Sequence, residues 1–443
     1  MAAVLAMMYL VLFSSLAVGF YAATTTSAQL ATNDLRGSDA LMAAESGMQL
    51  VRYQLANLNI PHNTAQGNLF TTIYNQLSTN LNGTANMAGQ TVGLSGSVIS
   101  IPSGTTSYIS LGNGSSFRAT ITQSGQQLIV AVNGNKGNLL INRTVQINYG
   151  IAQRASSVFN YGIASNGKIT TAGAAQILGS PDPTKGSLLS TNMTDATPVS
   201  AGGKVISGDI SITNPNGNVA VSGSIGGTSN VSLINANHIH KGVPAPDFPT
   251  VDTSAFAAYA TTKYVSGKTL DNMYIAPNTN PSFTGNTTIK GVLLIQTPNK
   301  VTFGGNVTIQ GAIVVQNSPT GTISQDVLNF SGNTTVQGVE TLPASYGSLR
   351  SLTGAFLLAP GFAVNFTGDF GAVNGSIIAD NVNFSGNAGG NINGSIVNLQ
   401  NLPMTVNGSS DIIITSTGTT NYPTGVFFGS NYVPLADTYR ELP

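Results

Sequence analysis

The spacing of hydrophobic residues changes near residue 60 and divides the chain into a helical start and a β-rich remainder. Residues 1–23, MAAVLAMMYLVLFSSLAVGFYAA, contain no charged side chain. As a helix rising about 1.5 Å per residue, this run is long enough to cross a bilayer of roughly 30 Å. It is longer than the apolar part of a cleavable secretory signal and has no basic start. We therefore expect it to span a membrane through an apolar set comprising Leu5, Leu10, Leu12, Phe13, Leu16 and Phe20.

Helical spacing continues beyond the apolar run, with apolar residues mostly three, four or seven positions apart, which is typical of an amphipathic helix. These residues are Ala28, Ala31, Leu35, Leu41, Met42, Met48, Val51 and Leu55. Asn57, Asn59 and Pro61 favour an end near residue 57, so the pattern predicts one helix of about 85 Å. Gly19 and residues 24–26, all Thr, are its weakest point, and we expect local unwinding there to cost little.

Residues 61–157 show the shorter spacing of β-strands. Strand-like runs lie at 96–101, 117–121, 127–132 and 143–147. Turn signals separate them, namely Asn113-Gly114, Ser124-Gly125, Asn133-Gly134 and Lys136-Gly137. Such a pattern predicts an antiparallel sheet that packs on the exit of the long helix.

A repeated unit in residues 282–421 begins with Phe and continues with Gly-Asn and a β-branched residue. Its Phe positions, 283, 303, 330, 366 and 384, are separated by 20, 27, 36 and 18 residues. These intervals fit coils of about 18–20 residues, one with an insertion and one interval holding two coils, which favours a parallel β-solenoid. Its expected core residues are Phe283, Ile289, Phe303, Ile309, Phe330, Val336, Phe366 and Phe384.

The rest of the chain completes a mainly β fold class with a long N-terminal α-helix, transmembrane and then amphipathic. The helix occupies residues 1–60, the antiparallel β domain follows, and residues 158–240 are expected to form the first β-helix coils. We interpret the proline-containing residues 241–281 as an insertion or clasp across the coils, and residues 422–443 as a C-terminal tail.

Composition narrows the classes of function. Only 16 Lys and Arg and 16 Asp and Glu occur among 443 residues, so the formal net charge is zero. A chain without a basic field is a poor candidate for binding nucleic acid. Because it contains no Cys, disulfides, zinc-thiolate sites, iron–sulfur clusters and cysteine nucleophiles are excluded.

Candidate chemistry in the remaining residues is sparse. Asp369, Asp380 and Asp411 are scattered, without the paired acids that a glycosidase needs or the acidic cluster of a calcium-dependent lyase. His238 and His240 would share one face of a strand, and Asp247 and Asp252 follow, so a metal site is one reading. We favour the other reading, a polar turn before the insertion. No catalytic residue, cofactor or metal is therefore predicted.

A family resemblance comes from the helix and a short motif. The segment Ala43-Ala44-Glu45-Ser46-Gly47 resembles a stretch of PilX-type minor pilins. A long helix followed by a β-rich body is similar to the layout of type IV pilins and pseudopilins. Residues 160–165 and 243–249 resemble the C-terminal region of bacterial pilus-assembly proteins. Two departures are Leu5, where pilins usually have Glu, and the lack of a basic leader before the apolar run. We therefore expect the given sequence to begin either at or near the processed end or downstream of the true start.

This resemblance implies a structural, non-catalytic subunit of a type IV pilus or type II secretion-like filament. The apolar half of the helix would anchor the subunit in the bacterial inner membrane and pack in the filament core after assembly. Expected partners are other pilin subunits or further copies of the chain, and the solenoid would serve adhesion or assembly through a surface polysaccharide or protein ligand. The alternatives are a membrane-anchored β-helix adhesin outside any filament and an anchored carbohydrate-active enzyme.

Overall fold

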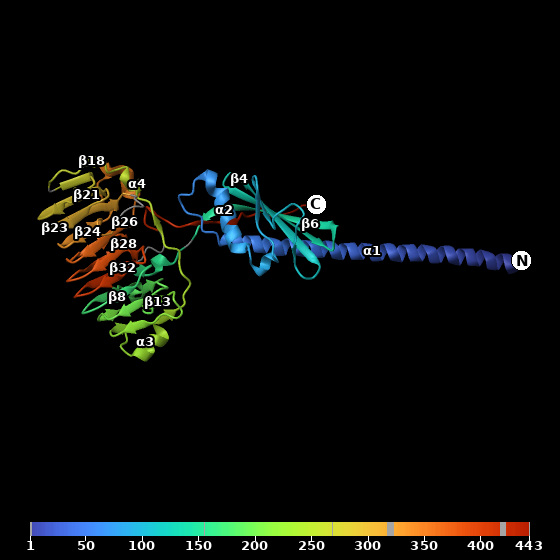
Figure 1. Ribbon diagram of the computed structural model, residues 1–443, viewed down its shortest axis with the longest axis horizontal. Helices are drawn as coiled ribbons and strands as arrows, with labels where there is room; N and C mark the ends of the chain where they lie inside the picture. The colour runs from blue at the N-terminus through green and yellow to red at the C-terminus, as the bar shows by residue number, and fades with distance from the viewer. Residues whose placement is uncertain (1, 155, 268, 317–322, 417–421, 443) are drawn as a thin grey trace. The chain divides into compact units, whose positions relative to one another are not determined.

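The computed structural model describes residues 2–154, 156–267, 269–316, 323–416 and 422–442 (Figure 1). The chain is mostly β, with one long N-terminal helix and a large sheet of parallel strands, which confirms the predicted fold class. It forms two compact units. The first unit comprises Met1–Arg154 and Gly429–Pro443, and the second comprises Ala155–Phe428.

Helix α1 (Ala2–Ala56) is uninterrupted over 55 residues, about 83 Å at the usual rise. The helix remains intact at Thr24, Thr25 and Thr26, where we expected a weak point. Each of these hydroxyl groups donates to the carbonyl oxygen four residues earlier, at 2.8–2.9 Å. Since these hydroxyls bond within the helix, the segment can remain helical in an apolar environment.

The first unit packs the C-terminal part of α1 against an antiparallel sheet. Its strand order is β1-β2-β4-β5-β6-β34, with β3 beside β4 and β35 beside β6. The bounds are β1 (Gly93–Ser95), β2 (Val98–Ile101), β3 (Ile109–Ser110), β4 (Ser115–Ser124), β5 (Gln127–Lys136), β6 (Asn138–Gln153), β34 (Ser430–Pro434) and β35 (Arg440–Leu442). Buried residues alternate with partly exposed ones along most of β4 and β5, so one face of the sheet supplies the core.

Three details of this unit differ from the sequence prediction. Residues 61–157 begin with a helix, α2 (Gln66–Leu81), followed by the 3₁₀ turn η1 (Ala85–Met87). The predicted turn at Asn133-Gly134 lies inside β5. Residues expected to form a C-terminal tail add β34 and β35 to the sheet by pairing with β6.

The second unit is a parallel β-solenoid built from two halves that meet in the middle of the stack. Strands of the first half are β7 (Ile163–Ser165), β8 (Ile169–Thr171), β9 (Gln176–Gly179), β10 (Leu188–Ser190), β11 (Val199–Ala201), β12 (Val205–Ile206), β13 (Ile210–Ile212), β14 (Val219–Val221), β15 (Ser224–Ile225) and β16 (Ile239–Lys241). Helical turns of this half are η2 (Val158–Asn160), η3 (Pro183–Gly186) and α3 (Val231–Asn237).

The second half returns to the middle from the opposite end. Its strands are β18 (Thr262–Lys263), β19 (Thr269–Ile275), β20 (Ser282–Phe283), β21 (Asn286–Ile295), β22 (Lys300–Phe303), β23 (Asn306–Val315), β24 (Val327–Phe330), β25 (Thr334–Gln337), β26 (Ala355–Phe366), β27 (Ala372–Asn374), β28 (Ser376–Phe384), β29 (Gly389–Asn393), β30 (Ile396–Asn398), β31 (Met404–Val406) and β32 (Asp411–Ser416). Ile163 of the first coil pairs with Leu188 on one side and Ile396 on the other. Coils 233 positions apart along the sequence are therefore neighbours in the stack.

Stacked phenylalanine rings fill the interior of the second half. Phe283, Phe303, Phe330, Phe366 and Phe384 follow one another with ring centroids 4.6–5.2 Å apart and interplanar angles of 9–22°. Parallel pairing in register places equivalent residues of adjacent strands about 4.8 Å apart, and this spacing suits parallel aromatic stacking.

We expected the interval of 36 residues between Phe330 and Phe366 to hold two coils, but in the structure it does not. These two phenylalanines pair directly, and Ile313 of β23 pairs with Leu357 of β26. The interval therefore holds one complete coil, formed by β24, β25 and the start of β26. Between β25 and β26 the chain makes an excursion over the outside of the coils through η4 (Val339–Thr341) and η5 (Ala344–Ser351).

The expected insertion 241–281 is shorter in the structure, because β19 already forms part of the stack by pairing with β21. Residues 242–261 connect β16 to β18, and Figure 1 shows α3 and β18 at opposite ends of the solenoid. This connection, which we call the clasp, includes β17 (Thr250–Val251) and α4 (Ser254–Ala257). Strand β17 pairs with β33 (Val426–Phe427).

The clasp and the excursion cover one side of the coils. Phe256 of the clasp and Leu349 of the excursion are buried in one cluster with Val292, Val314 and Leu358. Strands on this side are therefore apolar on both faces, which accounts for the continuous runs Gly-Val-Leu-Leu-Ile at 291–295 and Gly-Ala-Ile-Val-Val at 311–315.

Candidate functional site

The N-terminal part of α1 is fully exposed. Every residue from 2 to 36 is exposed, including the apolar set predicted to span a membrane, Leu5, Leu10, Leu12, Phe13, Leu16 and Phe20. Among the described residues, α1 alone is long and apolar enough to cross a membrane. The hydroxyl groups of Ser14 and Ser15 donate to backbone oxygens three residues earlier at 2.9 Å. Lipid or a neighbouring apolar helix would cover this surface favourably.

Small residues bring the following part of α1 close to the sheet. Gly37, Ala40, Ala44 and Gly47 are buried in the first unit. A Cβ atom on Gly134 of β5 would clash with the backbone of α1. Glycine at this position is therefore required by the close approach of strand and helix.

The motif residues 43–47 divide between this interface and the edge of the helix. Ala43 and Ala44 have no exposed surface, and a Cβ on Gly47 would clash with the ring of Phe117. Glu45 is half-buried and accepts a 2.5 Å hydrogen bond from the hydroxyl of Tyr439. That hydrogen bond, together with burial and the charges of Glu45 and Glu441, raises the pKa of Tyr439.

The amphipathic stripe was predicted only in part. Met48, Val51 and Leu55 are buried against the sheet, but Leu35 and Met42 are 64% and 66% exposed. The side of α1 with the smallest residues faces the sheet, since only small side chains allow this close approach. Apolar spacing could not distinguish this face from the one that remains exposed.

Two polar contacts connect the C-terminal part of α1 to the sheet. Asp39 forms an ion pair with Lys136 at 3.2 Å. The buried hydroxyl of Tyr149 contacts the Met48 sulfur at 3.5 Å. Burial raises the pKa of Tyr149 to about 12, although the positive charge of Arg52 opposes this shift.

All eight residues predicted for the solenoid core are buried there, namely Phe283, Ile289, Phe303, Ile309, Phe330, Val336, Phe366 and Phe384. Exposed asparagines form a row outside the same coils. The Asn306 amide donates to Asn286, and the Asn333 amide donates to Asn306, each at 3.2 Å. Such rows satisfy polar side chains between adjacent coils and suit a surface with few charges.

The histidine pair contacts an acid that precedes it in the sequence. His238 and His240 contact the two carboxylate oxygens of Asp209, at 2.8 and 3.1 Å. Partial burial raises the pKa of Asp209, but hydrogen bonds and charge from the two imidazoles outweigh burial and lower it overall. No group of three or more His, Cys, Asp or Glu able to hold a metal occurs among the described residues.

The acids considered for carbohydrate chemistry lie on different segments. Asp369 precedes β27, Asp380 belongs to β28, and Asp411 begins β32. Burial raises the pKa of Asp380, while a hydrogen bond to the backbone of Gly361 opposes that shift. Neither Asp369 nor Asp411 shares a strand with Asp380.

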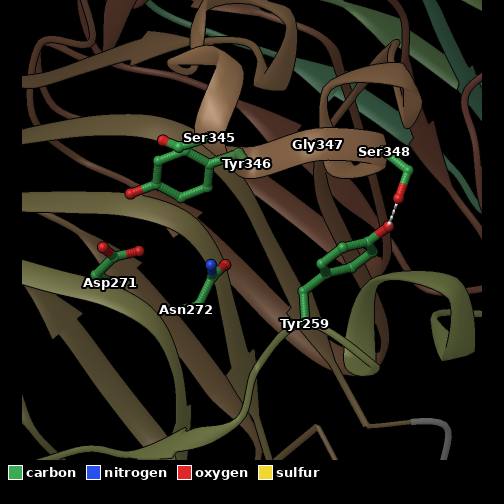
Figure 2. Close-up of a pocket in the computed structure, with 7 residues that line it drawn as sticks. All are labelled: Tyr259, Asp271, Asn272, Ser345, Tyr346, Gly347 and Ser348. Atoms are coloured by element: carbon green, nitrogen blue, oxygen red, sulfur yellow. Dashed lines mark hydrogen bonds between the residues drawn. The ribbon is translucent and has the colours of Figure 1, made fainter.

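A pocket of about 570 Å³ opens beside the excursion. Its lining residues are Tyr259, Asp271, Asn272, Ser345, Tyr346, Gly347 and Ser348 (Figure 2). The hydroxyl groups of Tyr259 and Ser348 lie 2.6 Å apart, and the Tyr346 hydroxyl points toward Asp271 (Figure 2). Burial and the Asp271 carboxylate raise the pKa of Tyr346 to about 12. We did not predict this site, because it joins segments far apart in the sequence.

No protein-family model and no curated protein matches this sequence. A crystal structure of the competence-associated pilin ComZ from Thermus thermophilus aligns with 92% of this chain and 97% of its own chain. The identity is 14% and the TM-score is 0.25. A TM-score this low does not establish a shared fold, so the function proposed for this chain rests on its own residues and geometry.

Proposed function

We propose that this chain is a non-catalytic, pilin-like subunit that is anchored in a membrane and then enters a type IV pilus or type II secretion-like filament. Before assembly the subunit would reside in the bacterial inner membrane. Its partners in the filament would be other pilin subunits or further copies of itself. The motif at residues 43–47 favours a relationship to the PilX-type minor pilins.

The observation that carries this proposal is the division of α1 into two parts. Residues 2–36 are exposed, and the helix continues without a break into the core of the first unit. A simple anchor needs only about 20 apolar residues. A rigid extension of this kind places apolar surface where helices of neighbouring subunits can cover it.

Adhesion is the proposed use of the solenoid in the assembled filament. Its support is a large folded surface with very few charges, whose rows of exposed asparagines offer hydrogen bonds to a surface polysaccharide or protein. We propose no catalytic role for the solenoid.

The test is to find the protein in filaments. Surface filaments would be sheared from cells that produce the full chain, and both the sheared material and the membrane fraction would be probed with an antibody against the solenoid. We expect the protein in both fractions, with an unrelated inner-membrane protein restricted to the membrane as a control. Complete retention in the membrane would contradict assembly.

That contrary result would favour the second candidate, a membrane-anchored β-helix adhesin. The apolar run of residues 1–23 supports it, because this run is by itself long enough to anchor the solenoid in a membrane.

A further inference from the structure

We propose that the pocket bounded by Tyr259, Asp271 and Tyr346 binds a neutral, hydroxyl-rich saccharide. This inference deepens the adhesive role of the solenoid and rests on the function proposed above. It assigns that role to one site and to one chemical class of ligand.

Three segments form the pocket, and each is a departure from the regular coil. Tyr259 comes from the clasp, Asp271 and Asn272 from β19, and residues 345–348 from the excursion (Figure 2). The excursion is an insertion between β25 and β26, the second and third sides of one coil, and the start of β26 pairs with β23 of the preceding coil. Without that insertion, the wall that carries Tyr346 would not be present.

A bulge in β19 shapes the floor. The register with β21 shifts between Asp271 and Met273, and the intervening Asn272 has a φ of +48°. In a regular strand, adjacent side chains point to opposite faces, whereas a bulge redirects one of them. This explains how the consecutive residues Asp271 and Asn272 both line the same pocket.

Hydrogen bonds already hold parts of the lining. The side-chain oxygen of Asn272 accepts a hydrogen bond from the backbone N–H of Val292 at 3.0 Å. This bond fixes the orientation of the amide and does not use its N–H donors. Tyr259 is held by its contact with Ser348. A site with fixed side chains loses little conformational entropy when a ligand binds.

The available groups match sugar hydroxyls. Asp271 offers acceptor oxygens, the Asn272 amide offers donors, and serine and tyrosine hydroxyls can do either. A sugar hydroxyl also both donates and accepts. The Tyr259 and Tyr346 rings are half-buried and add aromatic surface against which the C–H groups of a sugar ring can pack.

The charge of the lining residues and the volume of the pocket restrict the class of ligand further. None of the described residues that line the pocket is Lys or Arg, and Asp271 supplies a negative charge. An anionic sugar or a phosphate would therefore be repelled. The volume of about 570 Å³ falls within the usual range for small-molecule sites and is adequate for a short oligosaccharide.

The test measures saccharide binding to the purified full chain in micelles of lauryldimethylamine oxide, a detergent without a sugar headgroup. Isothermal titration calorimetry would use maltotriose, cellotriose and tri-N-acetylchitotriose as neutral probes and trigalacturonic acid as an anionic probe. We expect at least one neutral probe to bind and the anionic probe not to bind.

Substitutions inside and outside the pocket distinguish saccharide binding in the pocket from binding elsewhere on the surface. Asp271→Asn removes the charge at nearly constant shape and should weaken binding about tenfold, as expected for loss of a charge-assisted hydrogen bond. Tyr346→Ala should abolish binding. Asp369→Asn is the matched control, because Asp369 is an exposed carboxylate outside the pocket, and it should leave binding unchanged.

Three results would each overturn the inference: no binding of any neutral probe, preference for trigalacturonic acid, or equal affinity in the parent and Asp271→Asn. If Tyr346→Ala fails to fold, the affinity of Asp271→Asn still tests whether the pocket binds the saccharide. The Asp271→Asn protein should also appear in sheared filaments at the parental level. If the parent chain enters filaments but binds none of the neutral probes, the pocket inference fails while the proposed assembly role stands.

Discussion

The hydroxyl of Tyr439 donates a 2.5 Å hydrogen bond to the carboxylate of Glu45, which ties the end of the chain to the N-terminal helix. Tyr439 immediately precedes β35, a strand that pairs with β6. The last residues of the sequence thus help to hold α1 on the sheet.

Tyr439→Phe removes this hydrogen bond and keeps the ring. We expect the first unit to lose roughly 0.5–1.5 kcal/mol of stability, because the contact is charge-assisted but partly exposed. Hydrogen exchange of amides in β6 and β35 would report the change. Tyr53→Phe is the control, since Tyr53 is 66% exposed on α1, and equal protection in the two variants would show that the Tyr439 contact contributes nothing.

Alkaline pH should destabilise the first unit through Tyr149. Burial raises its pKa to about 12 in the folded protein, whereas an exposed tyrosine titrates near 10. The unfolded chain therefore releases this proton first as pH rises. The stabilising contribution is complete below about pH 10 and falls by roughly 2–3 kcal/mol toward pH 12.

Tyr149→Phe is the variant that checks the assignment, because it keeps the buried ring and cannot ionise. Urea denaturation of the full chain at several pH values, followed by the circular dichroism of the sheet, should show a smaller alkaline loss in this variant. An identical loss would assign the effect to other tyrosines of this unit, such as Tyr432, whose pKa burial also raises.

Gly47→Ala should loosen α1 from the sheet. The added Cβ atom would clash with the Phe117 ring and lie 2.8 Å from a Val132 methyl carbon, so the helix must move outward or the core must rearrange. Overpacking of this kind costs about 1–3 kcal/mol. Hydrogen exchange of β4 and β5 would measure the loss.

The matched control is Gly67→Ala, which changes a glycine of α2 that has open space around its Cβ position. Alanine favours helix by up to about 1 kcal/mol over glycine, so this variant should be neutral or slightly stabilising. Similar destabilisation by both substitutions would mean that packing at Gly47 is not the cause.

Phe303→Asp should disrupt the second half of the solenoid. Phe303 is fully buried, and its ring stacks on both Phe283 and Phe330. Replacement leaves a cavity and a buried charge without a partner, with an expected cost above about 4 kcal/mol. Thr308→Asp on the exposed face of the next strand, β23, is the control. Equal melting temperatures for the two variants would exclude a core role for Phe303.

Periodic features of the fold could be read from the sequence, because they depend on neighbouring residues along the chain. Helix α2 was also readable, although we assigned its residues to the β domain. Its buried residues Leu69, Phe70, Ile73, Leu77 and Leu81 have helical spacing. We assigned α2 to the β domain because strand-like runs follow it in the sequence, and this assignment was wrong.

Other features depend on long-range register and left no local signal. Nothing near Ile163 indicates that it pairs with both Leu188 and Ile396. The pocket follows from the same register, since Tyr259, Asp271 and Tyr346 meet only after the coils have stacked. One clue was available in the continuous apolar runs at 291–295 and 311–315, which indicate strands covered on both faces and hence something packed outside the coils.

The two parts of α1 should respond differently to charge. Leu12→Lys places a cation in the middle of the apolar run, where lipid or neighbouring helices would have to bury it without a partner. We expect this variant to fail in membrane insertion or in assembly. Leu35→Lys lies beyond the apolar run and is 64% exposed, so insertion and the fold of the first unit should be preserved.

Leu35→Lys is therefore the more informative variant for assembly. Since its side chain does not pack on the sheet of its own subunit, a loss of protein from sheared filaments with a normal amount in the membrane would indicate that another subunit covers this part of α1. Hydrogen exchange of β5 should remain at the parental level and serves as the control for folding. If Leu35→Lys enters filaments as the parent does, the exposed helix beyond the apolar run does not contribute to subunit packing at that position, and contacts must be confined to residues nearer the N-terminus.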